Sequence, residues 1–89
     1  MFHTYILRCA DGTFYAGSTN DLTERLHQHN HAKAGAHYTK IRRPVVLVRS
    51  WAHRTLARAR AHEAEIKRMS REEKEALLTR ASDPRILRD

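Results

Sequence analysis

Five side chains capable of acid–base, phosphate or metal chemistry are spaced so that they could share one site. They are Tyr5, Tyr15, Arg25, His29 and Glu63. The first three follow one another at intervals of ten residues, and the last three each interrupt a helical face that is otherwise apolar. Burying a polar group alone is costly, so each group on such a face needs a partner or a task. The pattern therefore indicates a shared site.

The chemistry open to this set is hydrolysis of a phosphodiester. That reaction needs a base for the water, positive charge on the phosphate and usually a metal ion. Glu63 is the candidate metal ligand, since Mg²⁺ often uses one or two carboxylates beside substrate phosphate and water. Arg25 could bind a phosphate oxygen through its fork of donors. His29 could position the water or protonate the leaving oxygen.

Each of these residues also has a purely structural interpretation. Tyr5 and Tyr15 could be ordinary residues that pack in a sheet. Tyrosine is also a poor base, unless nearby positive charge or a metal lowers its pKa from about 10. Arg25 could extend past the core to water. His29 could be a hydrogen-bonded histidine at the edge of the core, and Glu63 could reach solvent from the edge of its stripe.

The two tyrosines can cooperate only in one register of a predicted hairpin. Residues 2–9 and 13–18 are rich in aromatic and β-branched residues and predict its strands. A two-residue turn would place Tyr5 and Tyr15 on opposite faces. A three-residue loop over 10–12, with a left-handed glycine in a bulge, places them on the same face, and we predict this loop. The predicted pairs are Leu7 with Tyr15 and Tyr5 with Gly17, and the left-handed residue is Gly12.

Capping signals predict three helices further along the chain. Helices are expected over 22–33, 56–69 and 71–80. Their caps are Asp21 with Glu24, Thr55, and Ser70 with Glu73. Residues 30–43 predict a long polar loop, and the unbroken apolar run over 45–48 predicts a strand covered on both faces.

The order ββαβαα predicts an α+β fold, a small antiparallel sheet flanked by helices. A chain of 89 residues allows one core. We expect one domain over 1–80, followed by a tail over 81–89 that contains Pro84.

The positive charge is concentrated in the middle of the chain. The net charge is +7, and residues 41–69 carry eight basic and two acidic side chains. This favours a basic patch and a polyanionic partner, although a solvated basic surface would look the same. One loop combines aromatic and basic residues that could grip a nucleic-acid backbone or stack on a base, or could simply be exposed. Its candidate substrate-binding residues are Tyr38, Lys40, Arg42 and Arg43.

Several other classes of protein and site are disfavoured. No apolar stretch reaches the roughly 18–20 residues of a membrane span, and no signal peptide is visible. Cys9 is the single cysteine, which excludes an internal disulfide and favours an intracellular, cytoplasmic protein. His27 and His31 could bind zinc, but zinc sites usually need more ligands at recognisable spacing.

The ordered set of residues resembles the GIY-YIG nuclease family, close to its small standalone bacterial members. The resemblance covers about residues 2–80. It is carried by Thr4-Tyr5-Ile6-Leu7-Arg8-Cys9, Asp11-Gly12, Tyr15-Ala16-Gly17-Ser18-Thr19-Asn20, Arg25, His29, His37-Tyr38-Thr39, Arg42-Arg43-Pro44, and Glu63 with Ile66-Lys67. The first motif reads His-Thr-Tyr, Ser18 stands where several relatives have a basic residue, and no asparagine follows Asn30.

The resemblance implies a three-stranded antiparallel sheet and cleavage of DNA phosphodiesters with Mg²⁺ or Mn²⁺, in DNA repair or recombination. It implies that Tyr5 is a general base or water-positioner and that Tyr15 orients the nucleophile or phosphate. Arg25 would stabilise the phosphate, His29 would assist proton transfer and Glu63 would bind the metal. The alternatives are a DNA-binding module of the same fold with little or no catalysis, and an adaptor for a partner protein. Family members usually use a separate DNA-binding domain for targeting, so the resemblance also implies a partner protein or a separate targeting subunit.

Overall fold

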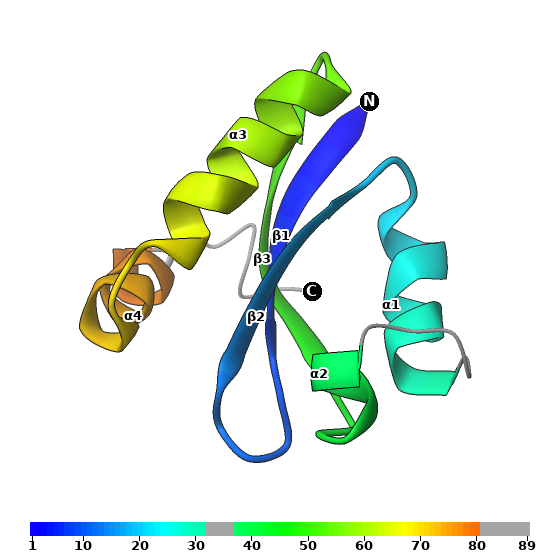
Figure 1. Ribbon diagram of the computed structural model, residues 1–89, viewed down its shortest axis with the longest axis vertical. Helices are drawn as coiled ribbons and strands as arrows, with labels where there is room; N and C mark the ends of the chain where they lie inside the picture. Colours follow the sequence, from blue (N-terminus) through cyan, green and yellow to red (C-terminus); the bar gives the residue numbers. More distant parts are fainter. Residues whose placement is uncertain (32–36, 81–89) are drawn as a thin grey trace.

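The computed structural model describes residues 1–31 and 37–80. One antiparallel sheet of three strands lies between two groups of helices (Figure 1), which confirms the predicted α+β fold. The strands stand in the order β2-β1-β3, so β1 is central. The elements are β1 (Phe2–Arg8), β2 (Phe14–Thr19), α1 (Leu22–His31), α2 (His37–Lys40), β3 (Val46–His53), α3 (Leu56–Lys67) and α4 (Arg71–Arg80).

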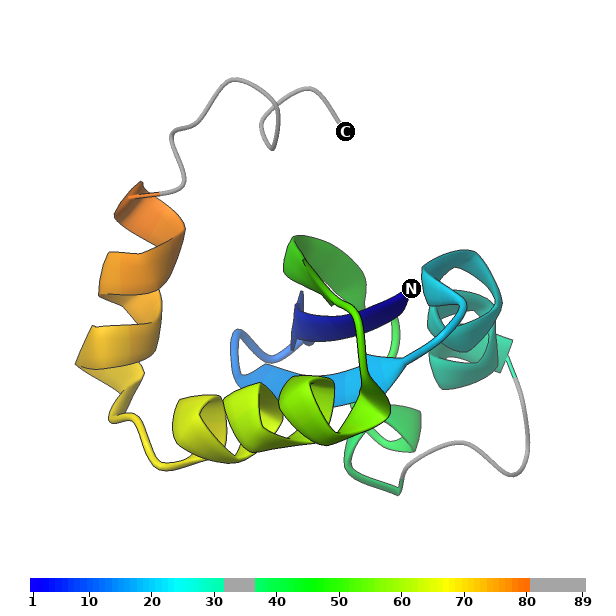
Figure 2. The ribbon, with the colours of Figure 1, turned by 90° about the horizontal axis from the view of Figure 1, so that it is seen from above.

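The two faces of β1 build two separate clusters of buried side chains. Tyr5 and Leu7 pack on the side of α1 and α2, against partly buried residues that include Leu26. Ile6 packs on the opposite side, against Ile66 of α3. This alternation is the period-two pattern of a strand that is buried on both faces. Figure 2 shows α4 turning away at the end of α3, and its Leu77 and Leu78 pack against the cluster of Ile6 and Ile66.

The hairpin has the predicted register. Tyr5 pairs with Gly17 and Leu7 pairs with Tyr15. Gly12 has a φ of 85°, the left-handed conformation that the three-residue loop requires. The prediction that both tyrosines share one face is therefore confirmed, since both contact the same histidine.

Local capping chemistry explains where three helices begin. The side chains of Asp21 and Thr55 accept hydrogen bonds from backbone N–H groups three residues later, both at 3.1 Å. Ser70 and Glu73 form the complete reciprocal capping box. The box predicted at α1 is half formed, because Glu24 accepts from Gln28 instead of from the cap.

Three predicted boundaries need comment. Helix α3 ends at Lys67, two residues before the predicted end at 69. Helix α1 ends at His31, and residues 32 and 33 of its predicted range lie outside the described residues. The predicted tail over 81–89 also lies outside them, so the domain over 1–80 stays a prediction. Within the described part of the chain, no helix is both long and apolar enough to cross a membrane.

The polar loop predicted over 30–43 is wrong in part, because the short helix α2 lies within it. Its Thr39 is fully buried, and the Thr39 carbonyl accepts a hydrogen bond from the Arg42 N–H at 3.0 Å. Polar composition predicted exposure, but here the polar groups find partners inside the fold.

The prediction that the apolar run over 45–48 is covered on both faces is wrong. Val45 is buried, whereas Val46 and Leu47 are 50% and 37% exposed. The reason is topological: β3 is an edge strand, and its register against β1 shifts between Ile6 and Leu7. An apolar run alone does not distinguish an edge strand from a central one.

Candidate active site

The site begins where Tyr5 lies over Gly17 of the neighbouring strand. A Cβ atom added to Gly17 would lie 2.6 Å from Cζ of Tyr5, closer than real contacts allow. The missing side chain of Gly17 therefore provides the space that the phenol ring occupies. Tyr5 belongs to a buried cluster and is only 2% exposed, although its hydroxyl is polar.

His29 of α1 satisfies that buried hydroxyl. Its Nε2 atom lies 2.8 Å from the Tyr5 hydroxyl, and its Nδ1 atom lies 2.7 Å from Oγ1 of Thr39. The Tyr15 ring contacts the imidazole edge to face, with 5.2 Å between the ring centroids. Both ring nitrogens of His29 are therefore hydrogen-bonded, which fixes the orientation of the imidazole.

Thr39 is a residue to which the sequence analysis gave no function. Its hydroxyl is fully buried beside His29 and holds the imidazole from the side opposite Tyr5. A threonine in a polar loop carries no periodic signal, so only the folded arrangement reveals this contact.

Burial and charge shift both members of the Tyr5–His29 pair away from ionisation. Burial raises the pKa of Tyr5 to about 12, although the neighbouring Arg25 opposes the rise. Burial, with the charges of Arg25 and Arg43, lowers the pKa of His29 to about 4. At neutral pH the phenol is protonated and the imidazole is neutral, so one proton lies between the two groups.

The low pKa of His29 predicts acid destabilisation in a defined range. Below pH 6.5 this histidine is protonated in the unfolded chain but not in the folded chain. The contribution of His29 to the free energy of unfolding is therefore complete above pH 6.5 and is lost as the pH falls toward 4. We expect the free energy of unfolding to fall by about 2 kcal/mol between pH 7.5 and pH 5 from this group. Urea unfolding at both pH values measures it. The His29→Gln variant should lack this part of the loss, and equal pH dependence in both proteins would contradict the assignment.

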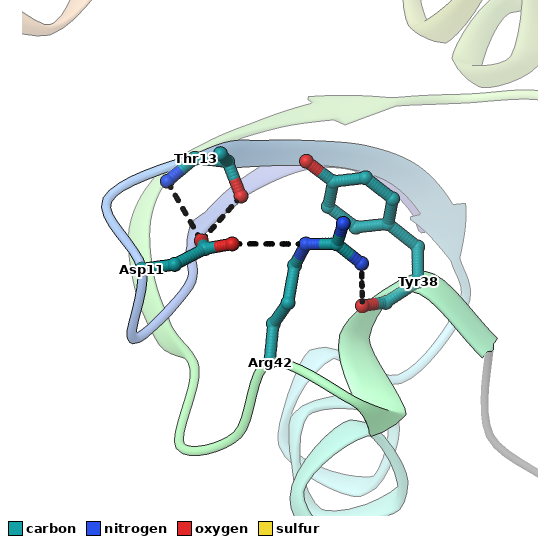
Figure 3. Close-up of polar contacts among 4 residues, drawn as sticks. All are labelled: Asp11, Thr13, Tyr38 and Arg42. Carbon is teal, nitrogen blue, oxygen red and sulfur yellow. Dashed lines mark hydrogen bonds and ion pairs between the residues drawn. The ribbon is translucent and has the colours of Figure 1, made fainter.

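Tyr15 is supported by the ring of Tyr38, which in turn packs against the guanidinium of Arg42. Figure 3 shows Tyr38 with Arg42, Asp11 and Thr13. Tyr38 stacks on Tyr15 with 5.9 Å between centroids, and the Arg42 guanidinium lies 3.9 Å from the centroid of the Tyr38 ring. Arg42 Nε pairs with Asp11 at 3.0 Å, and Arg42 Nη1 donates to the Tyr38 carbonyl at 3.1 Å. Asp11 also accepts two hydrogen bonds from Thr13. Arg42 thereby joins the hairpin turn to α2, whose Tyr38 stacks on Tyr15.

The arginines predicted to bind substrate form hydrogen bonds within the protein. Arg42 is held by Asp11 and Tyr38, as described above. Arg43 Nε donates to the His29 carbonyl at 2.6 Å, which satisfies an acceptor at the C-terminus of α1. Tyr38 is half-buried beneath Arg42, and Lys40 is exposed. The substrate-binding role of these four residues stays a prediction.

Arg25 and Glu63 approach the tyrosines from different sides of the sheet. Arg25 of α1 donates to Gln28 at 3.0 Å. Its charge opposes the rise in the pKa of Tyr5 and adds to the fall in the pKa of His29. Glu63 belongs to α3, yet its Oε1 accepts from the Ser18 hydroxyl of edge strand β2 at 2.7 Å. Four of the five predicted residues therefore belong to β2 or contact one of its residues: Tyr5, Tyr15, His29 and Glu63.

Lys67 links Glu63 to Tyr15. Its Nζ lies 2.7 Å from Oε2 of Glu63 and 5.8 Å from the centroid of the Tyr15 ring. Partial burial would raise the pKa of Glu63, but hydrogen bonds from Lys67 and Ser18 and the charges of Lys67 and Arg60 outweigh it and lower the pKa. Glu63 is therefore an ionised carboxylate that is already paired with the ammonium group of Lys67.

The donor set fits a hard divalent ion such as Mg²⁺. Such an ion keeps several waters and needs one or two carboxylates together with substrate phosphate. Glu63 offers one ionised carboxylate, and the ammonium on its Oε2 belongs to a half-exposed side chain that can move away. Over residues 1–31 and 37–80, no three His, Cys, Asp or Glu side chains form a cluster suited to a metal. Burial raises the pKa of the Cys9 thiol, which disfavours a nucleophilic role.

Comparisons with known proteins identify the family and the fold of this chain. The model of the GIY-YIG catalytic domain matches residues 1–76. A UPF0213 protein of Syntrophus aciditrophicus is 47% identical over 76 residues, which cover 85% of this chain and 87% of that protein. The UPF0213 protein YazA of Bacillus subtilis is 44% identical over 71 residues, covering 80% and 71%. The solution NMR structure of the UPF0213 protein BH0048 from Bacillus halodurans has a TM-score of 0.60 and 39% identity, covering 94% and 89%. The match over most of the chain shows that this protein belongs to the GIY-YIG family.

Proposed function

We propose that the protein is an endonuclease that hydrolyses DNA phosphodiester bonds with the help of Mg²⁺ or Mn²⁺. The observation that supports the proposal is the convergence around β2. Tyr5 and Tyr15 both contact His29 on one face of the sheet. Ser18 of β2 holds Glu63 at the edge of that strand. Membership of the GIY-YIG family supports a nuclease, and a role in DNA repair or recombination is part of the proposal.

The proposed roles follow from the protonation states. Arg25 would bind a nonbridging phosphate oxygen, since its guanidinium is always charged and offers paired donors. Tyr5 and His29 would orient the attacking water. The Tyr5 oxygen would accept a proton from that water while the phenol proton passes to Nε2 of His29. Tyr5 becomes a base only where added positive charge lowers its pKa from about 12, and Arg25 already acts in that direction.

Glu63 would hold the divalent ion in place of the Lys67 ammonium. A bound ion supplies positive charge to the phosphate oxygen. Ser18 keeps the carboxylate in position by donating to its other oxygen, so Oε2 can exchange its cation without loss of that support.

Nicking of supercoiled plasmid and of branched duplex DNA tests the proposal. We expect product with Mg²⁺ or Mn²⁺ and none with EDTA. Arg25→Ala should lower the rate about 100- to 1,000-fold, the usual loss when one donor to developing charge is removed. The matched control is Arg8→Ala, which removes an exposed arginine at the end of β1 and should nick like the parent. Equal rates for the two variants would contradict the assignment.

A second candidate is a DNA-binding module of the same fold without useful catalysis. Two observations favour it: Oε2 of Glu63 is already paired with Lys67, and the Tyr5 phenol resists ionisation. This candidate predicts salt-sensitive DNA binding with no product in either metal. The nicking assay separates the two functions, because binding alone is common to both.

A further inference from the structure

The excess positive charge of this protein is not available where its sequence suggested. Three of the arginines between residues 41 and 69 donate hydrogen bonds to backbone carbonyls, and one of them also forms an ion pair. Arg42 and Arg43 donate around α2, and Arg49 donates to the Leu77 carbonyl at 2.8 Å beneath α4. Within residues 41–69, the basic side chains that remain on the surface belong to α3 and its two ends.

The two edges of α3 carry different charges. Arg60, Glu63 and Lys67 are three and four residues apart, so they lie along the edge beside β2. We call this the site edge, and its formal charge is positive. Arg58 and Glu65 line a hollow with His53 and His62 on the other edge, where one positive and one negative charge cancel.

Arg60 is exposed on the site edge, and within the described part of the chain its guanidinium makes no hydrogen bond or ion pair. Its charge nevertheless reaches the site, since it helps to lower the pKa of Glu63. An anionic strand that approaches Glu63 would be repelled by the carboxylate. Arg60 and Lys67 lie on either side of Glu63, and their two positive charges make the net interaction with the strand attractive.

We propose that the site edge of α3 is the surface on which the phosphate backbone of duplex DNA lies, with Arg60 in direct contact with a phosphate. The inference rests on the proposed function, since it assigns the substrate-contacting surface of that same site. The contact would carry no sequence information, because a guanidinium on a phosphate fixes position and register only. Arg58, on the other edge of the same helix, would stay clear of the strand.

The two arginines give a matched test. Arg60→Ala and Arg58→Ala remove the same charge from the same helix, and both side chains are exposed. Binding to a fluorescent DNA duplex is measured by anisotropy over about 50 to 200 mM salt. EDTA is present so that the duplex is not cleaved during the measurement. We expect Arg60→Ala to weaken binding several-fold and to reduce the slope of log K against log salt by about 1. Arg58→Ala should keep the parental slope.

Each other outcome contradicts the inference. Equal losses in both variants would mean that the strand responds to the net charge of α3 and not to the site edge. Parental slopes in both variants would place the DNA elsewhere. In either case nicking by the parent would leave the proposed function intact. A parent that neither nicks nor binds the duplex would overturn the proposed function as well.

Discussion

Replacement of Gly17 by alanine is expected to lower the nicking rate at least about 100-fold, although Gly17 has no side chain to take part in chemistry. The reason is the Tyr5 ring that lies over it. An added Cβ would stand 2.6 Å from Cζ and 3.0 Å from Cε2 of Tyr5. The ring must then move, and the 2.8 Å hydrogen bond between its hydroxyl and His29 cannot survive the movement. Loss of one positioned donor commonly costs this much in rate.

The same substitution should cost about 1–3 kcal/mol of stability, because overpacking forces neighbours from their preferred positions. Urea unfolding measures this cost, and nicking is then assayed under conditions in which the variant is fully folded. The ¹⁵N chemical shifts of the His29 ring report directly on the lost hydrogen bond. A stable variant with parental His29 shifts and a parental nicking rate would contradict the assigned packing of Tyr5 on Gly17.

Gly12 provides the control within the same hairpin. It has a φ of 85°, but a Cβ there would meet nothing within 4 Å. Gly12→Ala should therefore cost about 1 kcal/mol through backbone strain alone, because an L-residue pays roughly that much in the left-handed region. Its nicking rate should stay parental. The pair separates the effect of a less stable hairpin from the effect of a displaced phenol.

The features that local chemistry determines could be predicted from the sequence. The loop over Ala10, Asp11 and Gly12 sets the hairpin register, and that register alone places Tyr5 and Tyr15 together. Caps at Asp21 and Thr55 mark the starts of two helices for the same reason, since the cap and its N–H donor are three residues apart.

The features that were missed depend on contacts between distant segments. Thr39 meets His29 only after α2 packs beside α1, and Arg42 meets Asp11 across 31 positions of sequence. A basic residue in a polar loop looks available for substrate until its folded partner is known. Likewise, whether Val46 and Leu47 are covered depends on strand order, which their apolar character does not encode.

Glu63 could be predicted as an intrusion on an apolar stripe, but its setting could not. Helix α3 packs on the face of the sheet opposite the tyrosines. The helical spacing of Glu63 therefore does not predict that it lies near them. The link is made at the edge of the sheet, where Ser18 of β2 and Lys67 of α3 both reach the carboxylate. A candidate site at an edge strand is accessible to a long substrate, which suits the proposed duplex better than a closed pocket would.

Glu63→Gln should therefore nearly abolish nicking while sparing the fold. The glutamine keeps the size of the side chain, and its amide oxygen can still accept from Ser18. The lost ion pair with Lys67 involves a half-exposed ammonium and is worth at most about 1 kcal/mol. The lost charge removes the proposed metal ligand, and loss of the metal would remove several kcal/mol of transition-state stabilisation, or about 1,000-fold in rate.

The control for Glu63→Gln is Glu65→Gln, which removes the same charge from the other edge of α3, where Glu65 lines the hollow with Arg58. It should nick like the parent. Binding of Mn²⁺ followed by electron paramagnetic resonance gives a readout that does not depend on turnover, and only Glu63→Gln should weaken it. DNA binding in EDTA should persist or tighten in that variant, because a negative charge has left the site edge. If Mn²⁺ binding and nicking were both unchanged in Glu63→Gln, its carboxylate would serve only to anchor Ser18 and Lys67, and the metal would need another ligand.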